Sequence, residues 1–310
     1  MSDIAFIFPG QGSQQVGMGK DLADNFKVAR ETFEEADEAL GFSISSLCFD
    51  GPEEELKLTQ NTQPAILTMS VACLRVLSEE TGIQPALLAG HSLGEYSSLS
   101  AAGAVEFADA VRTDRLRGTF MQEAVPPGEG AMAAILGLEA DAVDEICKKA
   151  AQGEVVSPAN FNSPWQIVIS GHAGAVSRAV EYAMEQDAKK AVMLAVSAPF
   201  HCSLMKPAAE RLEEALKDIP VSDLTTPVIS NADAALYPSK DEIKHLLVKQ
   251  VDHPVRWDES MREVAKRKIA AVIEIGPGKV LTGLMRRITK EVKTANLENP
   301  GDLQVLEQFK

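Results

Sequence analysis

Residues 87–105 read LLAGHSLGEYSSLSAAGAV, which combines a short apolar run, a glycine-flanked serine and a run of small residues. Ala86–Ala89 has the composition of the end of a buried strand, and Glu95–Val105 has the small residues of a helix that packs closely on a sheet. Between them, Gly90–Gly94 fits G-x-S-x-G, a tight strand-to-helix turn that exposes a serine hydroxyl. The stretch predicts an α/β protein with Ser92 as a candidate nucleophile. The alternative is an ordinary Gly-Ser turn.

Apolar runs elsewhere in the chain indicate further buried strands. They occupy Ile4–Phe8, Pro227–Ser230 and Ala270–Ile275. Helix patterns separate them, including one with Pro64 near its start and Gly82 just past its end. Alternating strands and helices predict a mostly parallel sheet.

One stretch of the chain departs from this alternation. Its pattern is strand, helix, two strands, helix and strand, over residues 131–136, 140–151, 155–161, 166–170, 175–186 and 191–196. This β-α-β-β-α-β order is that of a ferredoxin-like unit. We therefore expect a small domain of residues 129–197, inserted into a larger domain of residues 1–128 and 198–310, with a ligand-binding cleft between the two.

Composition narrows the class of protein. The chain has 310 residues and a net charge of −15, which argues against nucleic acid or an anionic membrane as the main partner. No apolar run approaches the roughly 20 residues of a membrane span, and the first residues, MSDIAFIFPG, carry no basic segment of a secretory signal. The cysteines lack the C-x-x-C spacing of metal or redox sites, which favours a cytoplasmic protein without a metal; they are Cys48, Cys73, Cys147 and Cys202.

A serine hydroxyl is a weak nucleophile and needs a base to accept its proton. His201 is the best candidate, because it follows the last strand of the small domain and comes after the serine, as in other G-x-S-x-G enzymes. The alternative is a structural histidine at a domain crossover. His91 is expected to face away from the hydroxyl, and the other histidines suit a helix start, a charged helix and an extended link (His172, His245 and His253). No acid stands out as a third member, so a triad and a dyad held by a carbonyl both stay open.

Two further features suggest binding groups. Arg117 falls on the apolar face of the helix pattern Phe107–Ala124, which carries Thr113, Leu116, Phe120, Met121 and Ala124. Such an arginine pairs with an internal acid or awaits an anionic ligand. The loop FPGQGSQ at residues 8–14 lacks the later residues of both nucleotide-binding motifs, but Gln11 between two glycines suits an oxyanion hole.

Taken together, these segments resemble the malonyl-CoA–acyl carrier protein transacylase family from residue 4 to about residue 290. The matching segments, in order, are FPGQGSQ (8–14), QPA (63–65), GHSLGEY (90–96), Arg117, FH (200–201), Gln250, PVRW (254–257) and EIGPG (274–278). The resemblance implies an α/β-hydrolase-like core with the ferredoxin-like insert described above.

The resemblance also implies roles for individual residues. Ser92 would be the nucleophile and His201 its base, oriented by the main-chain carbonyl of Gln250. The backbone N–H groups of Gln11 and Leu93 would form the oxyanion hole. Malonyl would pass from coenzyme A to the serine and then to the phosphopantetheine thiol of acyl carrier protein, without a cofactor.

Other residues would select the substrate and the partner. Arg117 would hold the malonyl carboxylate, Gln63 would line the substrate site, and the ring of Phe200 would leave little room for an α-methyl group. Basic residues would dock the carrier or coenzyme A, namely Lys189, Lys190, Arg286 and Arg287. We expect a monomer. The rival classes are a serine hydrolase or thioesterase, which has no need of Arg117, and a non-catalytic acyl-binding protein.

Overall fold

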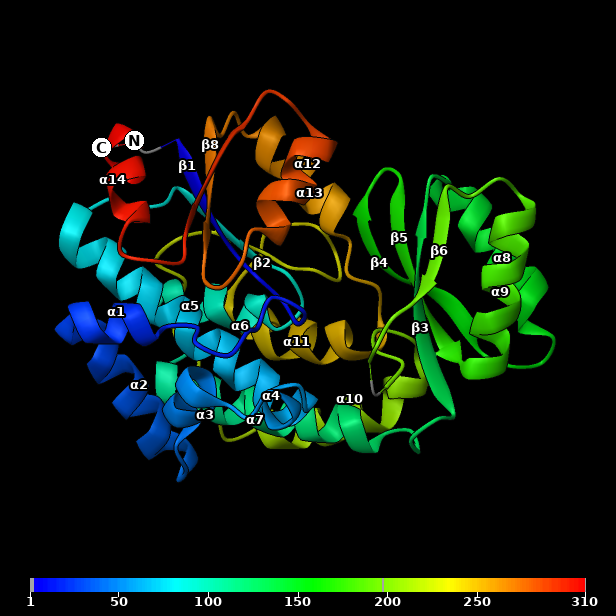
Figure 1. Ribbon diagram of the computed structural model, residues 1–310, viewed down its shortest axis with the longest axis horizontal. Coiled ribbons are helices and arrows are strands. Elements are labelled where there is room, and N and C mark those ends of the chain that lie inside the picture. Colours follow the sequence, from blue (N-terminus) through cyan, green and yellow to red (C-terminus); the bar gives the residue numbers. More distant parts are fainter. Residues whose placement is uncertain (1–2, 197, 310) are drawn as a thin grey trace.

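The computed structural model describes residues 3–196 and 198–309, and these residues form two β-sheets (Figure 1). The larger sheet is parallel, with strand order β7-β2-β1-β8-β9. The smaller sheet is antiparallel, with order β4-β5-β3-β6. The predicted α/β class is confirmed. The boundary expected after residue 197 involves Ser197, which lies outside the described residues.

The larger sheet positions the nucleophile turn. Its strands are β1 (Ile4–Phe8), β2 (Leu87–Gly90), β7 (Val228–Ile229), β8 (Ala271–Ile275) and β9 (Lys293–Leu297). Strands β1 and β2 run parallel with Phe8 opposite Gly90, so the loop after β1 and the turn after β2 leave the sheet side by side. Ligand sites of open α/β sheets lie at this carboxyl edge of the strands.

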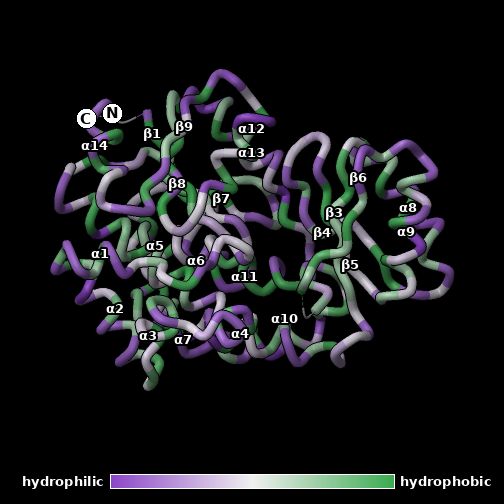
Figure 2. The backbone as a smooth tube through the Cα atoms, in the orientation of Figure 1, coloured by the Kyte–Doolittle hydropathy of each residue, from purple (hydrophilic) through white to green (hydrophobic). Residues whose placement is uncertain are grey.

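Helices cover both faces of the larger sheet. They are α1 (Lys20–Asn25), α2 (Lys27–Leu40), α3 (Ile44–Asp50), α4 (Glu53–Leu56), α5 (Thr59–Thr81), α6 (Gly94–Ala101), α7 (Phe107–Glu123), α10 (Lys206–Leu216), α11 (Ile243–Asp252), α12 (Trp257–Lys266), α13 (Val280–Ile288) and α14 (Asp302–Leu306). Because successive strand side chains point to opposite faces, Phe6 and Phe8 join one apolar cluster and Ala5 and Ile7 join another. Figure 2 shows the apolar residues concentrated in these inner elements.

The segment that forms the smaller sheet has the element order expected from the sequence. It contains β3 (Gly130–Leu136), α8 (Ala140–Ala151), β4 (Val156–Ser163), β5 (Gln166–His172), α9 (Ala173–Glu185) and β6 (Lys190–Met193). Helices α8 and α9 cover the face away from the larger sheet (Figure 1). Strand β4 continues to Ser163, so the hairpin turn is shorter than predicted, and β6 ends at Met193 rather than at residue 196.

One local expectation is wrong. Leu116 is 41% exposed whereas Asp114 is fully buried, because α7 packs on α5 through a face centred on Arg117 and Gly118. His172 lies at the start of α9, as expected, and its Nδ1 accepts a hydrogen bond from the backbone N–H of Val155 rather than capping the helix. Near the C-terminus, α14 packs on the core through the buried Leu306. No helix in residues 3–196 and 198–309 has the length and hydropathy of a membrane span.

Candidate active site

The turn between β2 and α6 holds Ser92 in a strained conformation. Its φ of 53° lies in the left-handed region, which costs free energy for a residue with a side chain. The glycines on either side permit the turn. A Cβ at Gly90 would lie 1.8 Å from the carbonyl oxygen of Gly94, and one at Gly94 would lie 2.3 Å from that of Phe8. The G-x-S-x-G spacing is therefore required by close backbone packing.

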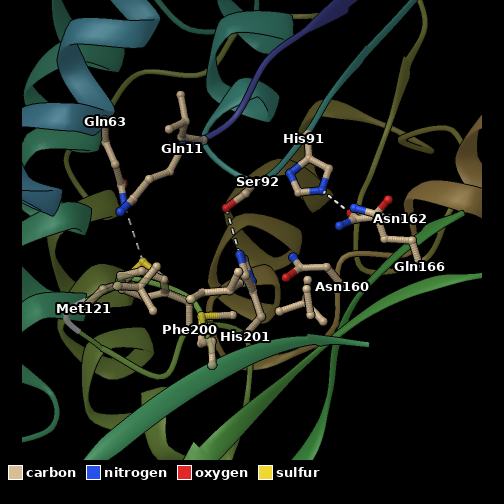
Figure 3. A pocket seen from close by; sticks show the side chains of 16 residues that line it. Gln11, Gln63, His91, Ser92, Met121, Asn160, Asn162, Gln166, Phe200 and His201 are labelled. Atoms are coloured by element: carbon tan, nitrogen blue, oxygen red, sulfur yellow. Dashed lines mark hydrogen bonds between the residues drawn. The ribbon is translucent and has the colours of Figure 1, made fainter. Parts of the chain in front are cut away.

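The hydroxyl of Ser92 faces a cavity of about 240 Å³ that residues from both sheets line (Figure 3). Gln11 and Leu93 line it from the larger sheet, whereas Met132 and Val168 come from the strands of the smaller one. The ring of Phe200 also lines the cavity and is nearly buried. A cavity of mixed apolar and polar lining suits a small acyl group and its attached arm.

The side chain of His201 contacts the nucleophile directly. Its Nε2 lies 2.8 Å from Ser92 Oγ, and its Nδ1 lies 2.8 Å from the main-chain oxygen of Gln250 (Figure 3 shows the first contact). Because a carbonyl oxygen only accepts, Nδ1 carries the hydrogen and Nε2 is free to accept the serine proton. The dyad is the arrangement present. The predicted Ser92, His201 and Gln250 lie together.

Burial sets the protonation state of this histidine. His201 is 3% exposed, and burial, helped by the charge of Arg117, lowers its pKa to about 3. The imidazole is therefore neutral at neutral pH, as a general base must be. Like the serine, it has a left-handed backbone, with φ of 59°.

Backbone donors are available beside the hydroxyl. Within the described residues, the N–H groups of Gln11 and Leu93 have no hydrogen-bond acceptor in the protein. By contrast, the N–H of Ser92 is occupied, since it donates to Asn231 Oδ1 at 2.7 Å. Free N–H groups next to a nucleophile can stabilise the oxyanion of an acyl-transfer intermediate.

Arg117 is 1% exposed and lies beside the nucleophile. Its guanidinium donates hydrogen bonds to neutral acceptors. It donates to Gln63 Oε1 at 2.6 Å, to Gln250 Oε1 at 2.7 Å and to Ser92 Oγ at 3.0 Å. The nearby carboxyl of Asp114 is fully buried, and its oxygens make no hydrogen bond within the described residues; burial raises its pKa to about 7. The arginine thus has no carboxylate bonded to it in residues 3–196 and 198–309.

A buried acid behind the site was missed by the sequence analysis. Glu95 accepts hydrogen bonds from Gln250 Nε2 at 2.6 Å, from the backbone N–H of Asn231 at 3.1 Å and from the hydroxyl of Tyr237. Burial raises its pKa to about 7. Since the amide nitrogen of Gln250 faces this acceptor, its amide oxygen faces Arg117. The position of the acid directly after G-x-S-x-G is the only signal in the sequence.

Two asparagines were also missed. Asn231 fastens the turn, because its Nδ2 donates to the carbonyl of Gly90 at 2.6 Å while its Oδ1 accepts from Ser92. Its place just after β7, at the carboxyl edge of a parallel strand, could have indicated it. Asn162 Oδ1 lies 2.8 Å from His91 Nε2, which turns that ring away from the serine as expected (Figure 3).

The predicted docking residues lie outside the cavity. All four are exposed, namely Lys189, Lys190, Arg286 and Arg287. Only Arg287 bonds to a residue of the cavity wall, donating from Nη1 to Gln166 Oε1 at 2.5 Å.

Comparisons with known proteins identify the family of the chain. The acyl transferase domain family matches residues 5–300. The chain is 51% identical over 306 residues to the malonyl CoA-acyl carrier protein transacylase of Bacillus subtilis, covering 98% of this chain and 96% of the relative. It is 50% identical over 300 residues to the enzyme of that name from Escherichia coli K12, covering 97% of each chain.

Solved structures show the same likeness. The malonyl CoA-acyl carrier protein transacylase of Coxiella burnetii superposes with a TM-score of 0.97 at 42% identity, over 99% of this chain and 98% of that one. A malonyl transacylase solved in complex with its type II PKS acyl carrier protein superposes with a TM-score of 0.97 at 47% identity, over 100% of each chain. The resemblance found in the sequence is confirmed: the chain belongs to the acyl transferase family, among the malonyl CoA-acyl carrier protein transacylases.

Proposed function

We propose that this chain transfers malonyl from malonyl-CoA to the phosphopantetheine thiol of acyl carrier protein, through a malonyl ester of Ser92. One observation carries the proposal. The oxygen Ser92 Oγ contacts a neutral base, His201 Nε2, and a buried cation, Arg117 Nη2. A nucleophile beside its base suits any acyl transfer, whereas the cation selects an acyl group that bears its own carboxylate.

The first half-reaction loads the serine. Ser92 Oγ attacks the thioester carbon while His201 Nε2 accepts the hydroxyl proton, and the N–H groups of Gln11 and Leu93 hold the developing oxyanion. The carbon–sulfur bond then breaks, and the thiol of coenzyme A leaves with the proton from His201. In the second half-reaction the pantetheine thiol attacks the ester by the reverse route, so the kinetics are ping-pong.

The same contacts support substrate selection. A carboxylate bound to Arg117 would lie next to the serine, as the short malonyl group requires. Gln63 Oε1 and Gln250 Oε1 accept from the guanidinium and hold it in place. The ring of Phe200 beside the cavity would disfavour an α-methyl group.

The proposal includes the domain organisation. Residues 1–128 and 198–310 would form an α/β-hydrolase-like domain, and residues 129–197 a ferredoxin-like one. The small sheet supports the second assignment, because its order β4-β5-β3-β6 follows a β-α-β-β-α-β chain. Acyl carrier protein would dock at the exposed basic residues Lys189, Lys190, Arg286 and Arg287. The cytoplasmic location and the monomeric state stay predictions.

Intact mass spectrometry after brief mixing with malonyl-CoA, without carrier protein, tests the function. The mass should rise by one malonyl group. Ser92→Ala should abolish the adduct, whereas the matched variant Ser100→Ala, at the far end of α6, should keep it. Release of free malonate with no thiol acceptor would indicate a hydrolase instead, and absence of any adduct would indicate a binding protein.

A further inference from the structure

The rim of the cavity carries an exposed aromatic residue that the transfer chemistry does not use. The chain has two tryptophans; Trp257 is fully buried, whereas Trp165 is 52% exposed. Tryptophan is enriched at binding interfaces relative to the rest of protein surfaces. Trp165 occupies the β4–β5 hairpin turn, and its carbonyl accepts from the backbone N–H of Gly137 at 2.9 Å. The turn is therefore hydrogen-bonded to the residue that follows β3.

The hairpin turn leads directly into the cavity. The next residue, Gln166, lines the same cavity as Ser92 and lies beside Asn162 (Figure 3). Gln166 also accepts from Arg287, because α13 lies next to the β4–β5 hairpin (Figure 1). Trp165 therefore stands at the mouth of the cavity, between the two sheets.

Cations lie on the segments next to the turn that holds this tryptophan. Lys189 packs against Gly137, the residue bonded to Trp165: a Cβ built on that glycine would lie 2.7 Å from Lys189 Cγ. Lys190 is the first residue of β6, and Arg287 lies across the mouth on α13. None of these three cations forms an ion pair within the described residues. In a chain with 45 acidic and 30 basic residues, unpaired cations gathered at one rim suggest an anionic ligand.

An exposed indole with unpaired cations on the neighbouring segments suits a nucleotide, because a base can stack on the ring while the cations bind phosphates. We propose that Trp165 is the platform for the adenine of coenzyme A, and that Lys189 and Arg287 bind the phosphates of the same nucleotide. This inference rests on the proposed function. The cavity of about 240 Å³ accommodates the acyl end of the substrate, so the bulky nucleotide remains at the mouth, where the tryptophan lies.

Fluorescence tests the site without catalysis. Adenosine 3′,5′-bisphosphate, the nucleotide half of coenzyme A, should quench the emission of Trp165 in the unmodified protein. In Trp165→Phe, only the buried Trp257 emits, and the quenching should disappear. An emission that the nucleotide leaves unchanged would overturn the proposal, whether or not the protein transfers malonyl.

Kinetics separate the nucleotide from the acyl group. Trp165→Ala should lower kcat/KM for acylation of Ser92 by malonyl-CoA about 5-fold or more, the loss expected for one stacked base. Acylation by malonyl-pantetheine, which lacks the nucleotide, should change less than about 2-fold. Trp165→Phe should retain most of the activity with malonyl-CoA, since its ring still stacks. Val305→Ala, which removes an apolar side chain 54% exposed on α14, is the matched control.

Two results would overturn the assignment. Equal losses with malonyl-CoA and malonyl-pantetheine would mean that Trp165 acts on the structure of the cavity rather than on the nucleotide. A loss confined to transfer onto acyl carrier protein would mean that the tryptophan contacts the carrier. Failure of the proposed function is distinct from both, because in that case the unmodified protein would form no malonyl adduct at all.

Discussion

Replacing Arg117 by alanine should separate malonyl transfer from acetyl transfer. The guanidinium is buried, contacts Ser92 Oγ at 3.0 Å and has no carboxylate hydrogen-bonded to it in the described residues, so a malonyl carboxylate would be the only carboxylate bonded to it there. Hydrogen bonds that involve a charged group contribute about 1.5–3 kcal/mol each. Loss of a bidentate pair should therefore cost about 2–4 kcal/mol, which is a fall of roughly 30- to 1000-fold in kcat/KM for malonyl-CoA.

Acetyl-CoA serves as the internal control for this variant. Removing the guanidinium leaves Gln63 Oε1 and Gln250 Oε1 without their donor, and the resulting structural cost falls on both substrates alike. Acetyl has no carboxylate to lose, so its transfer should fall far less, or rise. The ratio of the two kcat/KM values, measured by single-turnover acylation and by steady-state transfer, isolates the carboxylate contact.

Two further variants sharpen the test. Arg117→Lys should not restore malonyl transfer, because an ammonium group cannot donate to two glutamine oxygens and a carboxylate in one plane. Arg115→Ala, on the same helix, should leave the ratio unchanged, since Arg115 lies over the ring of Phe42 and donates to the carbonyl of Gln60. Equal losses of malonyl and acetyl transfer in Arg117→Ala would refute the reasoning and make the arginine a structural residue.

Three other predictions concern protonation and packing. The pKa of His201 is lowered from 6.5 to about 3, so an NMR titration of its imidazole should show no transition near pH 6.5. For the same reason, the free energy of unfolding should decrease as pH falls from about 6.5 towards 3. Burial raises the pKa of Glu95 from 4.5 to about 7, so its contribution has the opposite sign: stability is lost as pH rises through this range. Urea unfolding at pH 5 and 8 compares the unmodified protein with Glu95→Gln, which should be more stable at pH 8 relative to pH 5; the same pH dependence in both proteins would contradict the prediction. Gly94→Ala should lower the free energy of unfolding by on the order of 1–3 kcal/mol, because the added Cβ would clash with the carbonyl of Phe8. Gly283→Ala, where a Cβ meets open space, should leave it unchanged, and thermal unfolding compares the stability of the two variants.

The parts of the site that the sequence predicts are those set by short-range spacing. Gly90 and Gly94 are required by contacts within the turn and with the neighbouring strand, so their separation from Ser92 is fixed in any chain of this shape. His201 is identified by topology, since it follows the strand that returns the chain from the small sheet. Helical periodicity likewise placed Arg117 on a buried face, although the position of that face relative to Leu116 depends on packing against α5.

The parts that the sequence does not predict depend on contacts across long stretches of chain. The orienting group of His201 is a main-chain carbonyl, and because every residue has one, no side-chain pattern can indicate which residue supplies it; only the family resemblance pointed to Gln250. Glu95 is satisfied by Asn231, Tyr237 and Gln250, which lie 136 to 155 residues away. In sequence it is indistinguishable from an ordinary acid in the first turn of a helix.

The position of Arg117 also links the substrate to the base. Its positive charge contributes to the low pKa of His201, and a malonyl carboxylate bound to the guanidinium would neutralise that charge. Binding of malonyl should therefore raise the pKa of the imidazole and make it a stronger base when Ser92 must lose its proton, whereas acetyl leaves the charge in place. The rate of single-turnover acylation at saturating acyl-CoA, measured against pH, should show its acid limb at a higher pH for malonyl than for acetyl. In Arg117→Ala the separation of the two limbs should shrink, since the guanidinium no longer holds the carboxylate near the imidazole. Coincident limbs in the unmodified protein would show that the carboxylate is held away from the guanidinium.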